Sequence, residues 1–458
     1  MRDAMPILRE VAIGAPWLFA ILAAVIRRQE RVIGFIAASV SVLASGILLR
    51  AATTEDVPTE ALMVLFSCLT VLAMLVLPKR DCNPRTISGM LFVLGAALLA
   101  YSTDNLLVLF AAFALTTAPF VITALFGSSA WRPRIALLLS CVVFGVAIAL
   151  ILTATGLTTS IAALHGTSPG GMAVFALLVI TVILRKGICP AQAWVPDAAE
   201  HGPLIPTALL LNSHFGALLV AKLIVPMFPN AARDLFPVLS YLALVTALYV
   251  AIRALTENSP RRLLALVSLS QSACILAGLE SRTAEGMTGA FVHWFVVAIS
   301  TMSLFGILRL LEVRFGENLT VNRHLGLAEH APRLAVFFVI FALALVGLPG
   351  TLSFCSQDLL IHGTLMSHPL TGLLLPMAIA MNAVSIFRLF IRMFLGKRRT
   401  GFTAMADALP RERWILTAGV LFVVLGGLFP NAIVALSPAK TGAENQAFYE
   451  PARHDQVR

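Results

Sequence analysis

The sequence carries little charge for its length. Only 12% of its 458 residues are Asp, Glu, Lys or Arg, whereas 59% are hydrophobic and the mean hydropathy is +0.91. A soluble domain carries roughly 25% charged residues, so this composition excludes a water-soluble enzyme, a disordered chain and a DNA-binding domain. Acidic residues are scarcer than basic ones, 23 against 33. In so apolar a chain, the positive excess indicates loops at a membrane surface rather than nucleic-acid binding.

Cysteine motifs are absent as well. The six cysteines are scattered, with no CxxC pair and no paired histidines, so the sequence predicts neither a metal site nor a disulfide framework. No GxGxxG stretch that would bind NAD or flavin follows a strand, and no cysteine cluster would hold an iron–sulfur centre. We therefore expect no cofactor and no catalytic redox site in this chain, which is at most a translocase subunit of an enzyme.

Long apolar runs, in contrast, fill the sequence. A membrane helix needs about 20 mostly apolar residues, and continuous runs of that length, without the alternation of a β-barrel, predict an all-α membrane protein with about 14 transmembrane helices. The first run is too long, and too closely followed by others, for a cleavable signal peptide. The predicted spans are 6–26, 31–50, 58–78, 87–103, 105–127, 135–157, 170–190, 203–228, 235–256, 260–279, 286–311, 333–362, 369–396 and 414–437.

Lysine and arginine gather in alternate loops. The odd-numbered loops carry most of them, with a dense group at 388–413, and the even-numbered loops and both ends carry few. By the positive-inside rule, the odd-numbered loops face the cytoplasm. We therefore predict a multi-pass protein of a bacterial-type inner (plasma) membrane, with an even number of spans, both termini outside the cytoplasm and a cytoplasmic loop at 397–413.

Two predicted spans are interrupted in the middle of apolar sequence. In the seventh, Gly187 and Pro190 follow directly on Lys186, and in the twelfth, Pro349 and Gly350 stand between apolar segments. Proline removes a backbone donor and clashes with the preceding turn. Broken spans in corresponding positions of two halves indicate a transport site built on inverted repeats, although a simple proline kink also explains such a segment.

Several motifs resemble one known family. KGICPAQAWVPDA at 186–198, followed by GPLIPTAL at 202–209, is similar to the seventh and eighth spans of antiporter-like subunits. SPRRLLALVSLSQ at 259–271 resembles the family's tenth span, GLPGTLSF at 347–354 the break in its twelfth, and 382–396 its thirteenth. Such subunits occur in respiratory complex I, membrane-bound hydrogenases and Mrp cation/proton antiporters.

This resemblance implies fourteen helices with two inverted five-helix repeats, spans 4–8 and 9–13. The organisation would be helices 1–3 at 1–86, the first repeat at 87–228, the second at 235–397, and helix 14 with the tail at 398–458. Each repeat would contain one broken helix and one proton half-channel. Protons would pass along buried Glu, Lys and His side chains at mid-membrane depth, where charged groups are costly and usually functional.

Five residues are candidates for the proton pathway. Lys186 falls on the family's lysine at the break of the seventh helix, and His293 on the first histidine of its eleventh. His214 and Lys222 lie eight residues apart, close to two helical turns, so both can face one interior. Asp358 is a carboxylate inside an apolar span, where it needs a partner or a proton. Each also has a structural explanation, as a lysine that extends to the membrane surface, a hydrogen-bonded core histidine or an incidental polar residue.

Other positions depart from the family's pattern. The glutamate of its fifth helix falls at Ala114, the ionisable residue of its eighth at Leu211, and a second His and a Lys of its eleventh at Val297 and Thr301. In the twelfth, the usual Lys or Glu reads Gln357. The row of charged groups is therefore thinner than the family's.

The sequence leaves three functions open. The first is a proton- or cation-translocating subunit of an energy-coupling complex, driven by or driving a dehydrogenase- or hydrogenase-like partner. The second is the membrane subunit of a two-component inorganic-carbon uptake system of the DAB type, paired with a zinc-containing, carbonic-anhydrase-like subunit. The third is a structural subunit that kept the fold and lost the channel. Because the sequence ends soon after the last span, we expect no long lateral helix, which favours a shorter subunit or a two-component system.

Overall fold

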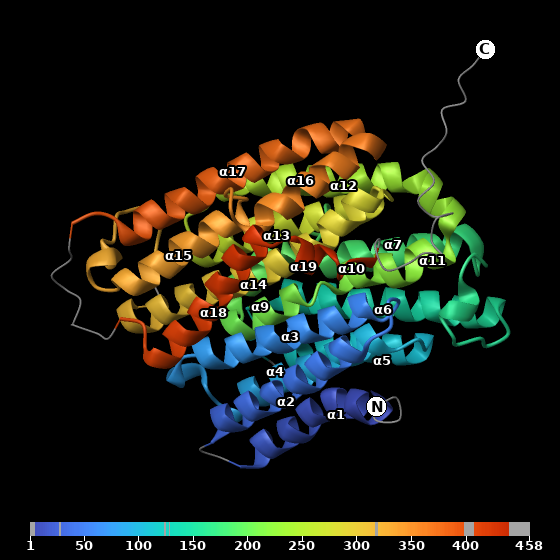
Figure 1. The fold of residues 1–458 in the computed structure, drawn as a ribbon, viewed down its shortest axis with the longest axis horizontal. Coiled ribbons are helices and arrows are strands. Elements are labelled where there is room, and N and C mark those ends of the chain that lie inside the picture. Colours follow the sequence, from blue (N-terminus) through green and yellow to red (C-terminus); the bar gives the residue numbers. More distant parts are fainter. Residues whose placement is uncertain are drawn as a thin grey trace.

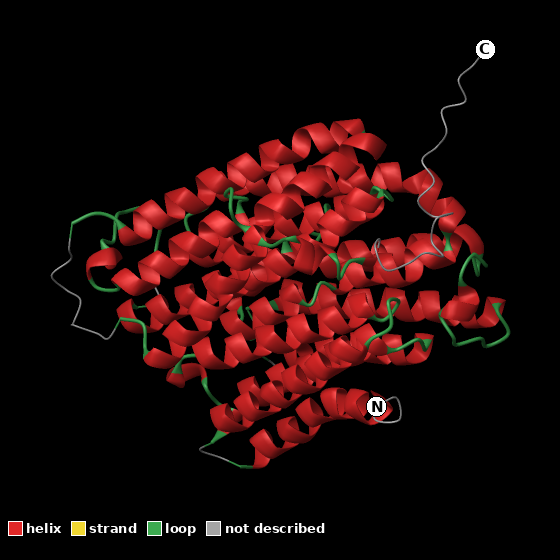
Figure 2. Ribbon diagram, in the orientation of Figure 1, coloured by secondary structure: helices red, strands yellow, loops and turns green. Residues whose placement is uncertain are grey.

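The chain folds into a bundle of helices that lie side by side with roughly parallel axes (Figures 1 and 2). The computed structural model describes residues 5–26, 29–122, 125–127, 129–316, 319–397 and 407–438. Within these ranges there is no strand, only an isolated bridge between Asn105 and Ser160. Ten of the described helices are long and apolar enough to cross a membrane. The predicted all-α architecture is confirmed.

The helices follow the predicted spans in order. Each predicted span overlaps one helix or one interrupted series of helices. The first part comprises α1 (Met5–Val25), α2 (Glu30–Ala51), α3 (Val57–Val76), η2 (Lys79–Asp81), α4 (Pro84–Ser102), α5 (Leu106–Val121), α6 (Trp131–Ala154), η3 (Ala162–Leu164), α7 (Gly171–Lys186), α8 (Trp194–His201), α9 (Leu204–Asn212), α10 (Phe215–Leu219), the π-helical segment η4 (Val220–Ile224) and α11 (Val225–Met227). The second part comprises α12 (Pro229–Thr256), α13 (Pro260–Glu280), α14 (Ala284–Phe315), η5 (Leu327–Glu329), α15 (Pro332–Leu345), α16 (Leu352–Ser367), α17 (Pro369–Phe394), α18 (Pro410–Leu428) and α19 (Asn431–Val434).

Capping residues account for several helix boundaries. The Asn83 side chain accepts a hydrogen bond from the Thr86 N–H at the start of α4, where Pro84 is the first helical residue. The Asn105 side chain caps the start of α5 in the same way, and Gly316, with a φ of 105°, follows the last residue of α14. A side-chain oxygen at the N-cap satisfies a backbone N–H that has no partner within the helix, so these polar residues fix where each apolar helix begins.

The centre of the bundle is formed by α13 and α14. All residues of α13 other than Arg261 and Arg262 are buried, and α14 is buried without interruption from Gly286 to Glu312. Outer helices expose apolar side chains instead, among them Leu18 of α1, which is 66% exposed. This arrangement suits a lipid environment, where polar side chains are costly unless they face the interior of the bundle.

The helix of the seventh span is interrupted where the sequence predicts. After α7 ends at Lys186, Gly187 adopts a left-handed φ of 75°, and its N–H donates to the Ile183 carbonyl. A Cβ at this position would lie 2.6 Å from a Val195 methyl group, so glycine is required for both reasons. Pro190 lies in the connection, and α8 starts only at Trp194.

The helix of the twelfth span is interrupted as well. Between the end of α15 at Leu345 and the start of α16 at Leu352, Gly347 and Gly350 both have positive φ angles, 84° and 90°, with Pro349 between them. The Gln357 amide donates to the carbonyl of Leu345, which satisfies one of the carbonyls that the break leaves open.

Parts of two predicted regions lie outside the described residues. These are 398–406 in the predicted cytoplasmic loop 397–413, and 439–458 in the predicted C-terminal tail.

Candidate functional site

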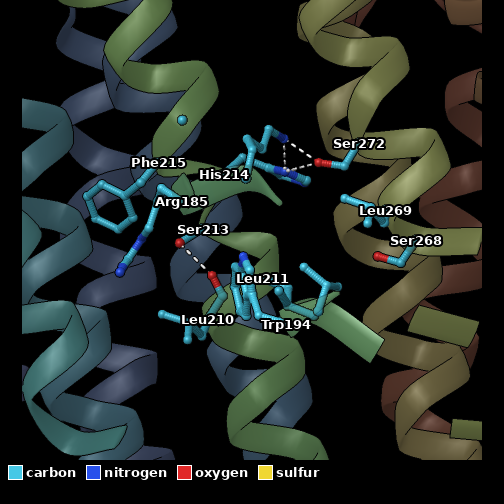
Figure 3. A pocket seen from close by; sticks show the side chains of 13 residues that line it. Arg185, Trp194, Leu210, Leu211, Ser213, His214, Phe215, Ser268, Leu269 and Ser272 are labelled. Carbon is cyan, nitrogen blue, oxygen red and sulfur yellow. Dashed lines mark hydrogen bonds between the residues drawn. The ribbon is translucent and has the colours of Figure 1, made fainter. Parts of the chain in front are cut away.

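Lys186 is buried at a junction of α7, α10 and α13. Its Nζ lies 2.7 Å from His214 Nδ1 and donates a hydrogen bond to Ser272 Oγ. His214 Nδ1 is also 3.3 Å from Ser272 Oγ, and Figure 3 shows these two side chains pointing toward one another. None of the described carboxylates forms an ion pair with Lys186. Because an amine and an imidazole nitrogen in contact share a single proton, this pair can pass a proton between its members.

Local backbone features bring the two nitrogens together. Lys186 is the last residue of α7, and His214 lies between α9 and α10 with a left-handed φ of 46°. Such a φ is unusual for a residue other than glycine and occurs often at functional sites. A Cβ on Gly216 would lie 2.5 Å from Lys186 Cγ, so this glycine leaves the space that the lysine side chain occupies.

A small cavity adjoins the Lys186–His214 pair. It has a volume of about 20 Å³, and both residues line it together with Ser268 and Ser272. A cavity of this size holds one water molecule. His214 Nε2 is buried and has no hydrogen-bond partner among the described residues, so the ring has one nitrogen on Lys186 and a second one available for a further donor or acceptor.

A second polar cluster surrounds His293, which is fully buried in α14. Its Nε2 lies 3.0 Å from Gln271 Oε1 of α13, and its Nδ1 lies 3.0 Å from Ser356 Oγ of α16. Gln271 directly precedes Ser272 in α13. Consecutive residues of one central helix therefore join the two clusters. We call the buried row formed by Lys186, His214, Ser272, Gln271, His293 and Ser356 the polar row.

Lys222 is not part of the polar row. Its Nζ donates to the backbone carbonyls of Tyr101, at 2.8 Å, and of Ala100, at 3.4 Å. The expectation that it shares a face with His214 assumes a continuous α-helix, but the chain between them passes through the break at His214 and into η4, which is π-helical. Lys222 instead lines a separate cavity of about 650 Å³, together with Tyr101 and Trp294.

Asp358, a predicted proton-pathway residue, does not lie in the polar row. Asp358 is exposed on α16, four residues after Phe354 and four before the exposed His362. Phe354 is 50% exposed and Met366, one turn beyond His362, is 66% exposed. The sequence correctly places this carboxylate in an apolar helix but does not indicate which face of that helix is buried.

The sequence did not single out the buried cation next to Lys186. Arg185 is buried beside Lys186, and its guanidinium donates to Thr117 Oγ1 at 2.7 Å and to Thr116 Oγ1 at 2.5 Å. It also lies over the Phe113 ring, with the guanidinium carbon 4.6 Å from the ring centroid. The signal for Arg185 is that two cations stand side by side in one apolar run. Adjacent side chains of an α-helix point in different directions, so the surroundings of Lys186 do not account for Arg185 as well. Ser272, Gln271 and Ser356 carry no comparable signal, since serine and glutamine are frequent in helices.

The positions that depart from the family's pattern do not restore its charges. Leu211 lines the 20 Å³ cavity, Val297 is fully buried, and Ala114 is half-buried on α5. Thr301 Oγ1 lies 2.8 Å from Asn212 Oδ1 and 2.6 Å from its own helix's Val297 carbonyl. These contacts are hydrogen bonds between neutral groups.

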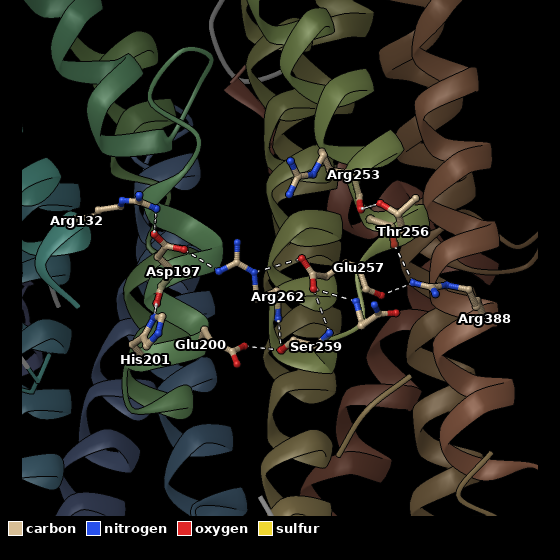
Figure 4. A network of polar contacts seen from close by, with 12 residues as sticks. Arg132, Asp197, Glu200, His201, Arg253, Thr256, Glu257, Ser259, Arg262 and Arg388 are labelled. Atoms are coloured by element: carbon tan, nitrogen blue, oxygen red, sulfur yellow. Dashed lines mark hydrogen bonds and ion pairs between the residues drawn. The ribbon is translucent and has the colours of Figure 1, made fainter. Parts of the chain in front are cut away.

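A network of ion pairs fixes α8 against its neighbours (Figure 4). Asp197 of α8 pairs with Arg132 of α6 at 3.0 Å and with Arg262 of α13 at 2.7 Å, and Arg262 also pairs with Glu257 at 3.2 Å. Burial alone would raise the pKa of Glu257. The pKa is nevertheless below its usual value, because the carboxylate accepts hydrogen bonds from the N–H groups of Ser259 and Asn258 and pairs with the Arg262 guanidinium. The network attaches the segment after the α7 break to the start of the helix that carries Gln271 and Ser272.

The fold and the polar row define a class of protein, a multi-pass α-helical membrane protein with buried side chains that can accept protons. Among the described residues, no group of three or more His, Cys, Asp or Glu side chains is placed to hold a metal ion. Residues 104–383 match the sequence profile of the NADH:quinone oxidoreductase/Mrp antiporter transmembrane family. The chain belongs to this family, as the motifs at the two breaks and in the tenth span predict.

The matches to curated relatives extend over only part of this chain and part of each relative. The chain is 25% identical to NADH-quinone oxidoreductase subunit M of Rickettsia prowazekii over 260 residues, which is 56% of this chain and 53% of that protein. It is 27% identical to NADH-quinone oxidoreductase subunit N 3 of Streptomyces griseus over 269 residues, 57% of this chain and 48% of that protein. The chain thus spans about half the length of the curated relatives it matches.

Solved membrane complexes contain chains of the same fold. A chain of respiratory complex I from Thermus thermophilus superimposes with a TM-score of 0.86 at 21% identity, over 97% of this chain and 100% of that chain. A chain of the Mrp complex from Dietzia sp. DQ12-45-1b gives 0.84 at 18% identity, over 97% and 98%. Both belong to multi-subunit membrane assemblies.

Proposed function

We propose that this chain is a proton-translocating, antiporter-like subunit of a multi-subunit energy-coupling complex in a bacterial-type plasma membrane. The observation that carries the proposal is the buried contact between Lys186 Nζ and His214 Nδ1 at the break after α7. Family membership and the polar row support it. The redox or other energy-releasing reaction would reside in a dehydrogenase- or hydrogenase-like partner.

The polar row suggests how a proton would move. The Lys186 amine and the His214 ring exchange one proton, and the Ser272 hydroxyl, which both donates and accepts, lies against both nitrogens. Gln271 Oε1 orients His293, so it is a positioning residue rather than a proton carrier. Since no direct contact joins Ser272 to His293, a water molecule or a side-chain rotation completes the route.

The two breaks support inverted repeats at 87–228 and 235–397. Lys186 stands at the break after α7, and His293 contacts α16 just after the break between α15 and α16. Lys186 and His214 would then belong to the first repeat, and the residues of the polar row on α13, α14 and α16 to the second. Such a site at the interface of two repeats allows each side of the membrane to open separately.

A partner subunit would cover the face of α16 that carries Asp358. An ionised carboxylate between exposed Phe354 and Met366 is costly in lipid, and a basic side chain from a partner's membrane helix removes that cost by pairing with it. We expect Asp358→Leu to reduce co-purification of the partner subunits at least about tenfold, because breaking a desolvated charge pair costs several kcal/mol, and about 1.4 kcal/mol already corresponds to a factor of ten. Blue-native electrophoresis of solubilised membranes measures this.

The control for Asp358 is Glu10→Leu. Glu10 is an exposed carboxylate of α1, at the opposite edge of the bundle from α16 (Figure 1). Equal recovery of the complex with both variants would show that the Asp358 face carries no partner.

The proposed topology places both termini outside the cytoplasm. A periplasm-active reporter fused after Lys440, a position outside the described residues, is therefore expected to be active, and one inserted after Lys397 to be inactive. The physical reason is the retention of basic loops on the cytoplasmic side. Activity of a cytoplasm-only reporter after Lys440 would contradict the topology.

Proton flux in proteoliposomes tests the function itself. The complex purified with its partners is expected to transport protons when the partner's reaction is started, and the chain without its partners is not. If transport needs sodium ions and moves no protons, the carried ion is Na⁺.

A non-conducting structural subunit is the second candidate. It is favoured by one observation, namely that no described carboxylate contacts Lys186. Under this alternative the assembled complex retains all of its transport when Lys186 is removed.

A further inference from the structure

Glu280, the last residue of α13, is a buried carboxylate that the polar row does not include. It is 3% exposed, and its Oε2 has no hydrogen-bond partner among the described residues. Burying an ionised carboxylate without a partner costs far more than burying the neutral acid. Glu280 therefore holds a proton in this arrangement, and the side chain can give that proton up only when a path opens.

Glu280 lines a small cavity that extends to the last turn of α7. The cavity has a volume of about 20 Å³, enough for one water molecule. Apart from Glu280, the side chains that line it are apolar, and they include Ile183 of α7 and Leu276 of α13. Ile183 lies three residues before Lys186, so the cavity begins within one helical turn of the polar row.

The spacing along α13 places Glu280 beyond the polar row in the direction of the loop to α14. Ser272, which contacts Lys186, is eight residues earlier in the same helix, a rise of about 12 Å at 1.5 Å per residue. Leu276 stands midway between them and lines the cavity. About two turns of α13 therefore separate the buried acid from Ser272, which contacts the buried amine.

A second, larger cavity lies next to the same end of α13. Leu279 and Arg282, on either side of Glu280, line the 650 Å³ cavity that also contains Lys222. The segment η4 separates the two cavities, because Val220 and Ile224 line the small one and Lys222 the large one. Local π-helix often marks a functional site, and this one forms the wall between Glu280 and the wide cavity.

We propose that Glu280 is a proton-carrying group that connects the 650 Å³ cavity to the Lys186–His214 pair. The carboxyl O–H gives its proton to a water molecule in the small cavity, and further water molecules that enter between Ile183 and Ser272 during turnover pass a proton on to the unprotonated amine of Lys186. The carboxylate that remains then takes a proton from the large cavity and regains its neutral form. This inference rests on the proposed function and names the group on one side of that same site.

Four variants of the complex in proteoliposomes test the proposal by proton flux. Glu280→Gln keeps the shape of the side chain but carries no transferable proton, so flux is expected to fall at least about tenfold. Glu280→Asp keeps the acid and is expected to retain a measurable part of the flux. Lys186→Ala tests the proposed function in parallel. The matched control is Glu285→Gln. Glu285 is an exposed carboxylate five residues further along the chain, and its replacement is expected to leave the proton flux unchanged.

Infrared difference spectra provide a readout that a merely structural role would not change. The carbonyl stretch of a protonated carboxyl group is expected in the wild-type complex during turnover and should disappear in Glu280→Gln. If Glu280→Gln prevents assembly, Glu280→Leu, which suits the apolar lining, replaces it with the same expected loss of flux.

The outcomes separate this inference from the proposed function. Full flux in Glu280→Gln, with flux abolished in Lys186→Ala, overturns the role of Glu280 and leaves the function standing. Full flux in both variants, or no proton flux in the wild-type complex, overturns both.

Discussion

Lys186→Ala is expected to abolish proton transport by the assembled complex, a loss on the order of 100-fold or more, because it removes a proton acceptor from the buried row. The side chain contributes the contacts with His214 and Ser272 and forms no ion pair with a described residue. Its loss should therefore leave the fold and the assembly intact. Proton uptake by proteoliposomes, together with the yield of the purified complex, measures both expectations.

Lys186→Arg is expected to fail as well. Arginine keeps the positive charge but stays protonated at any accessible pH, so it cannot pass its proton to His214. The larger guanidinium also has little room, since Gly216 already lies against the Lys186 stem. The control is Lys397→Ala, an exposed lysine after α17, for which we expect full transport. Normal transport in Lys186→Arg would show that the residue supplies charge and not a transferable proton.

His293→Gln is expected to lower proton flux roughly tenfold or more while the complex still assembles. Glutamine can keep a hydrogen bond to Gln271 or Ser356, so the packing between α13, α14 and α16 is preserved. It cannot accept a proton at neutral pH, whereas histidine can. Flux at saturating partner activity, measured against complex yield, separates lost conduction from lost assembly.

His324→Gln is the matched control for His293→Gln. His324 is exposed in the connection between α14 and α15, so flux should not change. If His293→Gln conducts as well as this control, His293 is a core histidine with a structural role, and the polar row ends at Ser272.

The sequence was sufficient to predict the all-α membrane fold, the two breaks and the family. Long apolar runs set the helices, and a glycine or proline that a helix cannot accommodate marks where one stops, as Gly187 does with its φ of 75°. Lys186 could be identified because a cation at such a break inside an apolar run is costly unless it has a role. These features are local, so they can be read without the tertiary structure.

The faces and ends of helices were harder to predict. Asp358 lies in a predicted apolar span, but the polar and apolar residues of its helix show almost no helical periodicity that would mark the buried face. Lys222 was placed with His214 by helical spacing, but the left-handed His214 and the π-helical η4 change the direction of the side chain. Glu280 was missed because it ends the apolar run, where a carboxylate normally reaches water, and only tertiary packing buries it.

The most direct measurement of the central claim is proton conduction through the polar row. Proteoliposomes containing the whole complex, in sodium-free medium and with the membrane potential clamped, are given a pH step across the bilayer while the partner's reaction proceeds. We predict rapid proton flux for the wild-type complex and none above the lipid background for Lys186→Ala combined with His293→Gln. Equal flux in both preparations would contradict the account, because the protons would then cross by a route that does not use these residues.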